Sequence, residues 1–196
     1  MDWATLMNRP AVYIDPTRLA ACFGERISVS LCERLRGESR LQDRLSAIIG
    51  DFYALTAAVG PEAVGQLDQN VALLPVGRIG DVVRHAGAVY WAGAIANMVR
   101  AEEVRWLRDK LGEALCTFAL ANRKLSGPPR KLEPVDGAEA RIAEDGMRCL
   151  GAWCQSQPEA VGRRVCLKSP AHPALDDRAQ SPFDEIGPAI IRCAAS

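Results

Sequence analysis

Two histidines and seven cysteines are the side chains best suited to bind a metal ion or to attack a substrate. His85 and His172 have no partner in an HExxH or HxxxH pattern, and no two cysteines are separated by two residues, the spacings that typify metal sites. The GxSxG turn of the α/β-hydrolases is absent as well. The sequence therefore predicts no metal centre and no catalytic nucleophile. We expect His85 to be a packed core or boundary residue and His172 to be solvated.

The cysteines are odd in number and form no CxxC pair, and Cys116 falls within an apolar helical pattern. A secreted domain held by disulfides would have a different arrangement. We therefore expect reduced thiols that pack as small apolar side chains in a reducing compartment. The seven residues are Cys22, Cys32, Cys116, Cys149, Cys154, Cys166 and Cys193.

One glycine-bearing segment and two acidic pairs are the remaining candidates for enzyme chemistry. The segment "GRIGDVV" lacks the Lys-Ser/Thr of a phosphate-binding loop, and no GxGxxG occurs. Glu102-Glu103 is better explained as charge at the start of a helix, and Asp176-Asp177 as a solvated turn, than as a general acid and base. We predict that the protein is not an enzyme and uses no cofactor.

Basic residues gather in two places. Lys+Arg and Asp+Glu balance at 24 each, so the chain has no overall field that would collect nucleic acid. A solvated linker or the rim of a protein-binding surface is favoured for these clusters, and a phosphate-contacting patch remains an alternative. The clusters are Arg123, Lys124, Arg130 and Lys131, and then Arg163 and Arg164.

Composition and periodicity both predict an all-α protein. Aromatic residues are only 6% while alanine is abundant, which favours packed helices over a β-sandwich. We expect an irregular multi-helix domain that contains a core helical hairpin at 78–121 and a smaller C-terminal lobe. Asp15-Pro16 is a strong helix start. Gly80, Gly87 and Gly93 are expected to let a neighbouring helix approach closely.

Three parts follow from the breaks in this pattern. Residues 1–121 are expected to form a helical body that includes the core hairpin. Residues 122–137 hold proline, glycine and basic residues and predict a linker. Residues 138–196 are expected to form a helical lobe with a tail from Ser169 onward. Because Pro170, Pro173, Pro182 and Pro188 interrupt it, this tail is expected to be extended or partly ordered, with its final "AIIRCAA" packed back on the lobe.

The apolar segments of the sequence bear on the compartment in which the protein is expected. The N-terminus lacks a basic region followed by an apolar one, so no signal peptide is predicted. The uncharged run Ala86–Val99 is 14 residues long, whereas a spanning helix needs about 20. We expect a cytoplasmic protein.

The order of several segments resembles one known family. "RPAVYIDPTRL" is similar to the opening box of the K-class accessory proteins of type III secretion systems, the SctK family that includes YscK and PscK. The stretch that begins "LLPVGRIGDVVRHAGAVYWAGAIANMV" resembles the family's Leu-Pro connector and the helix of small residues after it. "GPP", "QPEA" and "RRVCLKSP" follow in the family's order. The resemblance covers residues 9–170.

This resemblance implies a non-enzymatic adaptor of the injectisome sorting platform. Such a protein would lie at the cytosolic face of the inner membrane. Its implied partners are the forkhead-associated cytoplasmic domain of the ring protein SctD and the pod protein SctQ. Through SctQ it would connect indirectly to SctL and to the ATPase SctN, and it would contact no nucleic acid and insert into no membrane.

Six residues are candidates for the interfaces of such an adaptor, with simple packing as the alternative for each. They lie in the N-terminal box and in the region from Trp153 to Arg164. The candidates are Arg9, Pro10, Tyr13, Trp153, Arg163 and Arg164. Two other functions remain open: a helical regulator that binds nucleic acid through Arg123–Lys131, and a type III secretion chaperone.

Overall fold

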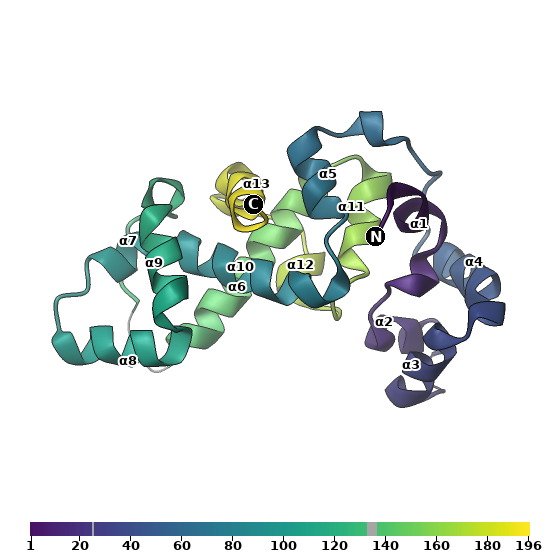
Figure 1. Ribbon diagram of the computed structural model, residues 1–196, viewed down its shortest axis with the longest axis horizontal. Helices are drawn as coiled ribbons and strands as arrows, with labels where there is room; N and C mark the ends of the chain where they lie inside the picture. The colour runs from purple at the N-terminus through teal and green to yellow at the C-terminus, as the bar shows by residue number, and fades with distance from the viewer. Residues whose placement is uncertain (25, 133–136) are drawn as a thin grey trace. The chain divides into compact units, whose positions relative to one another are not determined.

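The computed structural model describes residues 1–24, 26–132 and 137–196, and every regular element in them is helical (Figure 1). No strand occurs in these three ranges. The predicted all-α class is therefore confirmed.

Packing divides the chain into two compact units, each built from two separate stretches. Unit 1 contains Met1–Ile79 and Cys154–Asp176, and unit 2 contains Gly80–Trp153 and Asp177–Ser196. Each unit is therefore completed by a segment that returns from the C-terminal half of the chain.

The sequence predicted parts that are each continuous along the chain and are separated by a linker over 122–137, whereas each of these two units combines two stretches. Whether the predicted parts fold separately remains a prediction. Residues 133–136 of that linker lie outside the described residues.

Unit 1 is made of short helices joined by turns and irregular segments. Its elements are α1 (Trp3–Asn8), η1 (Pro10–Val12), α2 (Pro16–Ala21), α3 (Val29–Gly37), η2 (Ser39–Leu41), α4 (Gln42–Phe52), η3 (Pro61–Ala63), α5 (Gln66–Ala72), α11 (Glu159–Cys166) and α12 (Pro173–Asp176).

Side-chain caps start several of these helices. Asp2, Asp15 and Ser28 each accept a hydrogen bond from a backbone N–H in the first turn of α1, α2 and α3. Such caps satisfy N–H groups that the helix itself leaves without a partner. The predicted helix start at Asp15-Pro16 is confirmed.

The core of unit 1 forms where helices distant in sequence meet. The helix α1 packs against α11 and η1, and α2 packs against α3; Figure 1 shows α1 beside α11. The apolar side chains enclosed there include Leu6, Ile14, Leu19, Ile49, Val161 and Leu167. Their burial supplies most of the driving force for this unit.

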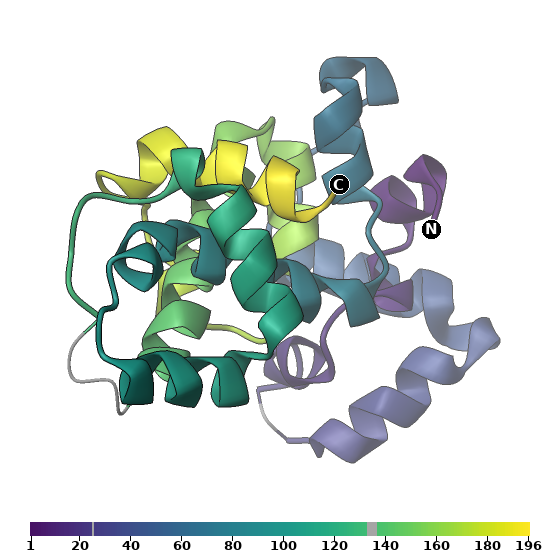
Figure 2. The same ribbon diagram turned by 60° about the vertical axis from the view of Figure 1, so that its left-hand side comes forward.

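Unit 2 contains longer helices. Its elements are α6 (Val76–Tyr90, which begins in unit 1), α7 (Ala92–Ala96), α8 (Ala101–Leu111), α9 (Glu113–Ala121), η4 (Arg123–Leu125), α10 (Ala138–Ser156, which ends in unit 1) and α13 (Phe183–Ala194). The helix α9 packs against both α7 and α8 (Figure 2).

Two glycines let α6 and α10 touch backbone to backbone. A Cβ on Gly87 would lie 1.9 Å from the carbonyl oxygen of Ile142, and a Cβ on Gly146 would lie 2.1 Å from that of Val83. Any larger residue would force the helices apart. The close approach predicted at Gly87 is confirmed.

The same prediction is wrong for the two other glycines of the pattern. A Cβ on Gly80 would have no atom within 4 Å, and Gly80 is exposed. A Cβ on Gly93 would lie 3.2 Å from Oγ of Ser126, which follows η4 and belongs to no helix.

The expected two-helix hairpin over 78–121 is instead four helices. Trp91 separates α6 from α7, and residues 97–100 separate α7 from α8. Gly112 has φ = 86° and separates α8 from α9. This left-handed conformation is easy for glycine and strained for other residues, so the predicted continuous second helix is broken there.

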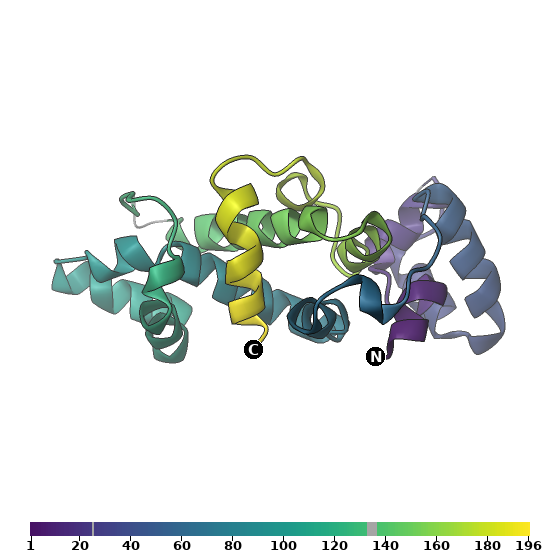
Figure 3. The same cartoon turned by 90° about the horizontal axis from the view of Figure 1, so that it is seen from above.

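The tail is not extended in its last part, because Phe183–Ala194 forms α13, and the expected packing of its final apolar residues is confirmed by the burial of Ile190 and Ile191. This helix crosses α10 (Figure 3), and Phe183, Gly187, Ile190 and Ile191 are buried. The spacing of these four residues places them on one helical face. Their burial outweighs the backbone hydrogen bond that Pro188 cannot make within the helix.

Among the described residues, no helix combines the length and the apolar character needed to cross a membrane.

Candidate partner-binding surfaces

The N-terminal candidates differ in exposure. Arg9 is half exposed, and its guanidinium lies 3.7 Å from the carboxylate of Asp43. Pro10 and Tyr13 are buried in unit 1. The Tyr13 hydroxyl donates a 2.6 Å hydrogen bond to the carbonyl of Leu6. Arg9 therefore reaches the surface of unit 1, whereas Pro10 and Tyr13 pack inside it.

The C-terminal candidates lie in both units. Trp153 is fully buried and belongs to unit 2. Arg163 in unit 1 is 46% exposed, 2.6 Å from the carboxylate of Glu159, and donates to the carbonyls of Tyr53 and Ala54. Of these two candidates, Arg163 is the one available to a partner at the surface.

Arg164, by contrast, is a buried cation bound to backbone carbonyls. Its Nε donates to Met7 at 2.9 Å, and its two terminal nitrogens donate to Ala160 and Thr56 at 2.9 and 3.1 Å. Burial lowers the pKa of the guanidinium, and the nearby Tyr13 opposes that change. Arg164 thus joins three segments of unit 1 through groups that need a donor.

Lys168 is a second buried cation and is only 2% exposed. Its ammonium donates to the carbonyls of Ala72 and Leu74 at 2.5 and 2.8 Å and lies 5.7 Å from the centre of the Tyr13 ring. Burial lowers the pKa of Lys168 to about 7. This side chain therefore ties the end of α5 to the segment that follows α11.

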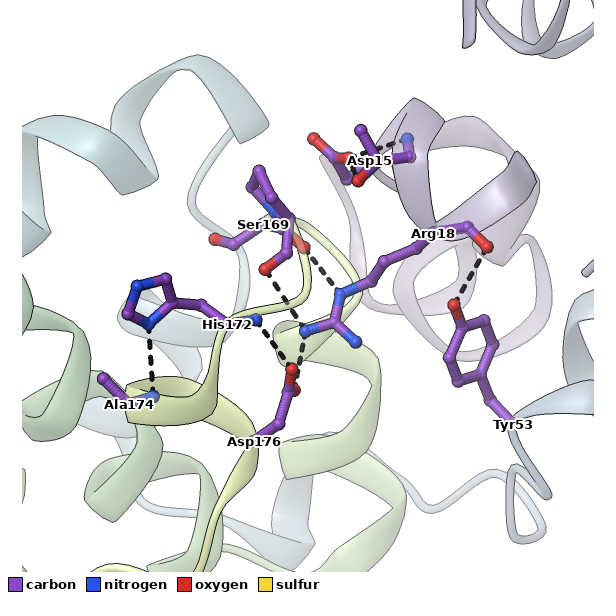
Figure 4. Close-up of polar contacts among 9 residues, drawn as sticks. Asp15, Arg18, Tyr53, Ser169, His172, Ala174 and Asp176 are labelled. Atoms are coloured by element: carbon purple, nitrogen blue, oxygen red, sulfur yellow. Dashed lines mark hydrogen bonds and ion pairs between the residues drawn. The ribbon is translucent and has the colours of Figure 1, made fainter. Parts of the chain in front are cut away.

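Arg18 anchors the same returning segment from α2 (Figure 4). Its Nε donates to the carbonyl of Ser169 at 2.6 Å, and a terminal nitrogen lies 2.6 Å from a carboxylate oxygen of Asp176. The other oxygen of Asp176 accepts the backbone N–H of His172 at 2.9 Å. Asp176, expected as part of a solvated turn, is instead about one-third exposed and engaged on both oxygens.

This set of buried cations was not predicted from the sequence, although the sequence contains a signal for two of them. Arg164 and Lys168 are four residues apart and share a helical face with Ala160, Val161 and Val165. The four of these residues within α11 are buried, as is Lys168 just beyond it. A basic residue on the apolar face of a short helix predicts a buried donor to backbone carbonyls.

The seven thiols are free. Four are buried, as expected of small apolar side chains: Cys32, Cys116, Cys149 and Cys154. The hydrogen bond with Cys154 lowers the pKa of the Cys166 thiol, and burial raises that of Cys154. In the three described ranges, no group of three His, Cys, Asp or Glu side chains is arranged to hold a metal ion.

A groove of about 680 Å³ opens in unit 2 between the α7–α8 connection and the segment after η4. We call it the α7–α8 groove. Its apolar lining includes Ala94, Met98, Val99 and Pro129. Its charged lining consists of Arg100, Glu103, Arg123, Arg130 and Lys131. Three of the basic residues that sequence analysis placed in the linker therefore line one concave surface.

The structure thus defines an all-α protein. Buried basic side chains connect the segments of its unit 1, and its unit 2 contains the α7–α8 groove. Comparison with known proteins places it more closely: the family described as "YOP proteins translocation protein K (YscK)" matches residues 4–187. The chain belongs to this family, which is one of type III secretion components. The family resemblance found in the sequence is confirmed.

A more distant relative is described as a nodulation protein. The chain is 25% identical over 167 residues to "Nodulation protein NolU" of Rhizobium fredii, and the aligned region covers 84% of this chain and 74% of the relative. The NolU of Sinorhizobium fredii matches with the same values. No solved structure is significantly similar.

Proposed function

We propose that this protein is a non-enzymatic adaptor of the type III secretion sorting platform. It links the forkhead-associated cytoplasmic domain of the ring protein SctD to the pod protein SctQ, at the cytosolic face of the injectisome. Through SctQ it connects indirectly to SctL and to the ATPase SctN. The observation that carries the proposal is the family match over residues 4–187.

The architecture supports a role with two partners. Unit 1 presents Arg9 and Arg163 at its surface, while unit 2 contains the α7–α8 groove. Two compact units with different surfaces suit a protein that holds two different partners. Pro10, Tyr13, Trp153 and Arg164 support those surfaces from within the units.

Co-elution is the direct test. The full chain is mixed in turn with the cytoplasmic domain of SctD and with SctQ from the same bacterium, and each mixture is analysed by size exclusion with light scattering. A complex of defined ratio with each partner is expected. A chain that remains monomeric beside both partners at tens of micromolar would overturn the proposal.

Arg9 allows a sharper test on unit 1. Because charges at the edge of an interface act mainly on the association rate, Arg9→Glu is expected to slow association with one partner and to leave the thermal midpoint unchanged. Arg44→Glu, an exposed residue of α4, is the control of equal charge change. Equal rates for Arg9→Glu and Arg44→Glu would remove Arg9 from the interface.

A further inference from the structure

The α7–α8 groove carries an excess of positive charge. Of its basic residues, Arg100 is 3.2 Å from the carboxylate of Glu103, so these two charges largely cancel. Arg123, Arg130 and Lys131 are exposed, and none of them forms an ion pair with a carboxylate in the described part of the chain. An occupant that brings carboxylates would complement these three cations.

The groove also has an apolar part of its lining that is open to solvent. Val99 is 92% exposed, the largest exposed fraction among the exposed large apolar side chains in the described ranges. Met98 and Pro129 also line the groove. A partner that covers Val99 would remove apolar surface from water, which phosphate groups alone would not do.

The wall formed by the segment after η4 is fixed to the rest of unit 2. The N–H of Gly127 donates to the carbonyl of Tyr90 at 2.9 Å. A Cβ on Gly127 would lie 2.6 Å from the Tyr90 ring, so the two are in close contact. Leu132 is buried at the other end of this wall. This fixed wall lowers the conformational entropy that would be lost on binding.

We propose that the α7–α8 groove binds an acidic segment of a partner protein, in which carboxylates flank at least one apolar side chain. The carboxylates face Arg123, Arg130 and Lys131, and the apolar side chain covers Val99. A volume of about 680 Å³ accommodates several side chains. The inference rests on the proposed function only for its assumption that the partner is a protein.

Nucleic acid fits this groove less well than an acidic peptide does. The chain as a whole has a net charge of zero, and nucleic-acid affinity depends chiefly on the neutralisation of many phosphates. Aromatic side chains on which bases stack do not occur among the groove's described lining residues.

The test selects a random library of 12-residue peptides on the full chain. Enriched peptides are then synthesised with a fluorescent label and titrated by anisotropy. We expect them to be acidic and to contain an apolar residue. Their affinity should fall as salt is raised from about 50 mM to about 500 mM, because the screening length shortens.

Three variants assign the binding to the groove. Arg123→Glu/Lys131→Glu should weaken binding at least about tenfold, because two attractive charges become repulsive. Val99→Ser should weaken it about five- to tenfold through loss of apolar contact. The control Arg105→Glu/Lys110→Glu changes the charge equally at exposed positions of α8 that do not line the groove and should bind as the wild type does.

Several results would overturn the inference. These are the enrichment of no peptide above background, the enrichment of peptides that are not acidic, and equal binding by the groove variant and the control. Salt-sensitive binding of a 20-base-pair DNA duplex that requires Arg123 and Lys131, without peptide binding, would assign the groove to nucleic acid instead.

Co-elution separates this inference from the adaptor role. A wild-type chain that co-elutes with SctD or SctQ but selects no acidic peptide would overturn the groove proposal alone. A chain that binds acidic peptides in the groove but co-elutes with neither protein would overturn the adaptor role and leave the groove assignment intact.

Discussion

Long cationic side chains that reach backbone carbonyls connect distant segments of unit 1, whereas the longest helices of unit 2 cross with their backbones in contact. In unit 1, Arg18, Arg164 and Lys168 donate to carbonyls in segments distant in sequence. In unit 2, Gly87 and Gly146 permit the contact of α6 and α10. The short helices of unit 1 expose many terminal carbonyls, which explains why donors are needed there and less so in unit 2.

The two arrangements should fail in different ways when changed. Removal of a buried donor leaves carbonyls unpaired, so the loss of stability depends on the hydrogen bonds broken. Substitution of a glycine by a larger residue forces helices apart, so the loss of stability depends on the steric clash. Four predictions, each with its own control or comparison, test this difference.

The largest loss is expected for Arg164→Met in unit 1. Methionine fills part of the volume but leaves the carbonyls of Met7, Thr56 and Ala160 without their donor. Thr56 is exposed, so water can replace its hydrogen bond. Two buried carbonyls left unpaired, at about 1–3 kcal/mol each, give an expected loss of about 2–6 kcal/mol in the free energy of unfolding. Urea unfolding followed by circular dichroism measures it.

Arg163→Met is the matched control, one residue away. Its side chain is 46% exposed, so water replaces the hydrogen bonds that are lost, and a change below about 1 kcal/mol is expected. Equal losses for the two variants would show that burial of Arg164 does not set its contribution.

The next largest effect is expected at the helix crossing of unit 2. Gly87→Ala places a methyl group against the backbone of Ile142 and should cost about 2–3 kcal/mol. Gly80→Ala, in the same helix but with no atom within 4 Å, should stabilise by about 0.5–1 kcal/mol through helix propensity. Thermal unfolding of both variants compares them; a shift in the same direction would contradict a crossing at Gly87.

These glycines show what the sequence could and could not predict. The spacing of small residues on an apolar helix predicted a close approach, and Gly87 makes it. The pattern could not tell which glycine faces a neighbour, because that depends on the direction in which α10 crosses. No close approach was predicted at Gly146, the matching glycine on α10, because the apolar pattern around it does not show that a backbone lies opposite.

The polar groups were harder to predict for a similar reason. Exposure of Arg163 and burial of Arg164 follow from helix geometry once α11 is known to begin at Glu159, but the sequence alone does not show which face of that helix packs inward. The groove joins residues from α7, α8 and the segment after η4, so its shape depends on tertiary packing. Its basic residues were identified from the sequence, but the apolar residues that line it beside them were not.

A third prediction concerns pH and Lys168. The pKa of Lys168 is lowered from 10.5 to about 7 by burial, so from pH 7 to pH 10 the unfolded chain holds a proton that the folded chain has released. Stability should therefore rise with pH over this window. Between about pH 7 and about pH 9, the free energy of unfolding of the wild type should rise by about 2 kcal/mol more than that of Lys168→Met.

Urea titrations of both proteins at the two pH values measure this gain. Taking the difference between the proteins cancels thiols that do not interact with Lys168, such as Cys149, whose raised pKa acts in the opposite direction. The Cys154 thiol does interact with Lys168, so both proteins are compared in a Cys154→Ala background. Parallel pH profiles for wild type and variant would mean that Lys168 stays charged when folded, held by the carbonyls of Ala72 and Leu74.

The smallest effect is expected where each unit buries a tyrosine. The Tyr90 hydroxyl of unit 2 has no hydrogen-bond partner in the described part of the chain, while its ring stacks on Phe183 with centres 4.6 Å apart. Tyr90→Phe keeps the stacking and removes an unpaired polar group, so stability should stay the same or rise by up to about 1 kcal/mol.

Tyr13→Phe in unit 1 is the matched comparison, because its hydroxyl donates to Leu6 and its loss should cost about 1–2 kcal/mol. Chemical denaturation of the two variants gives both values. Opposite signs would confirm that unit 1 depends on buried hydrogen bonds more than unit 2 does. Equal losses would mean that the Tyr90 hydroxyl has found a partner, and the difference between the units would then disappear at this pair of residues.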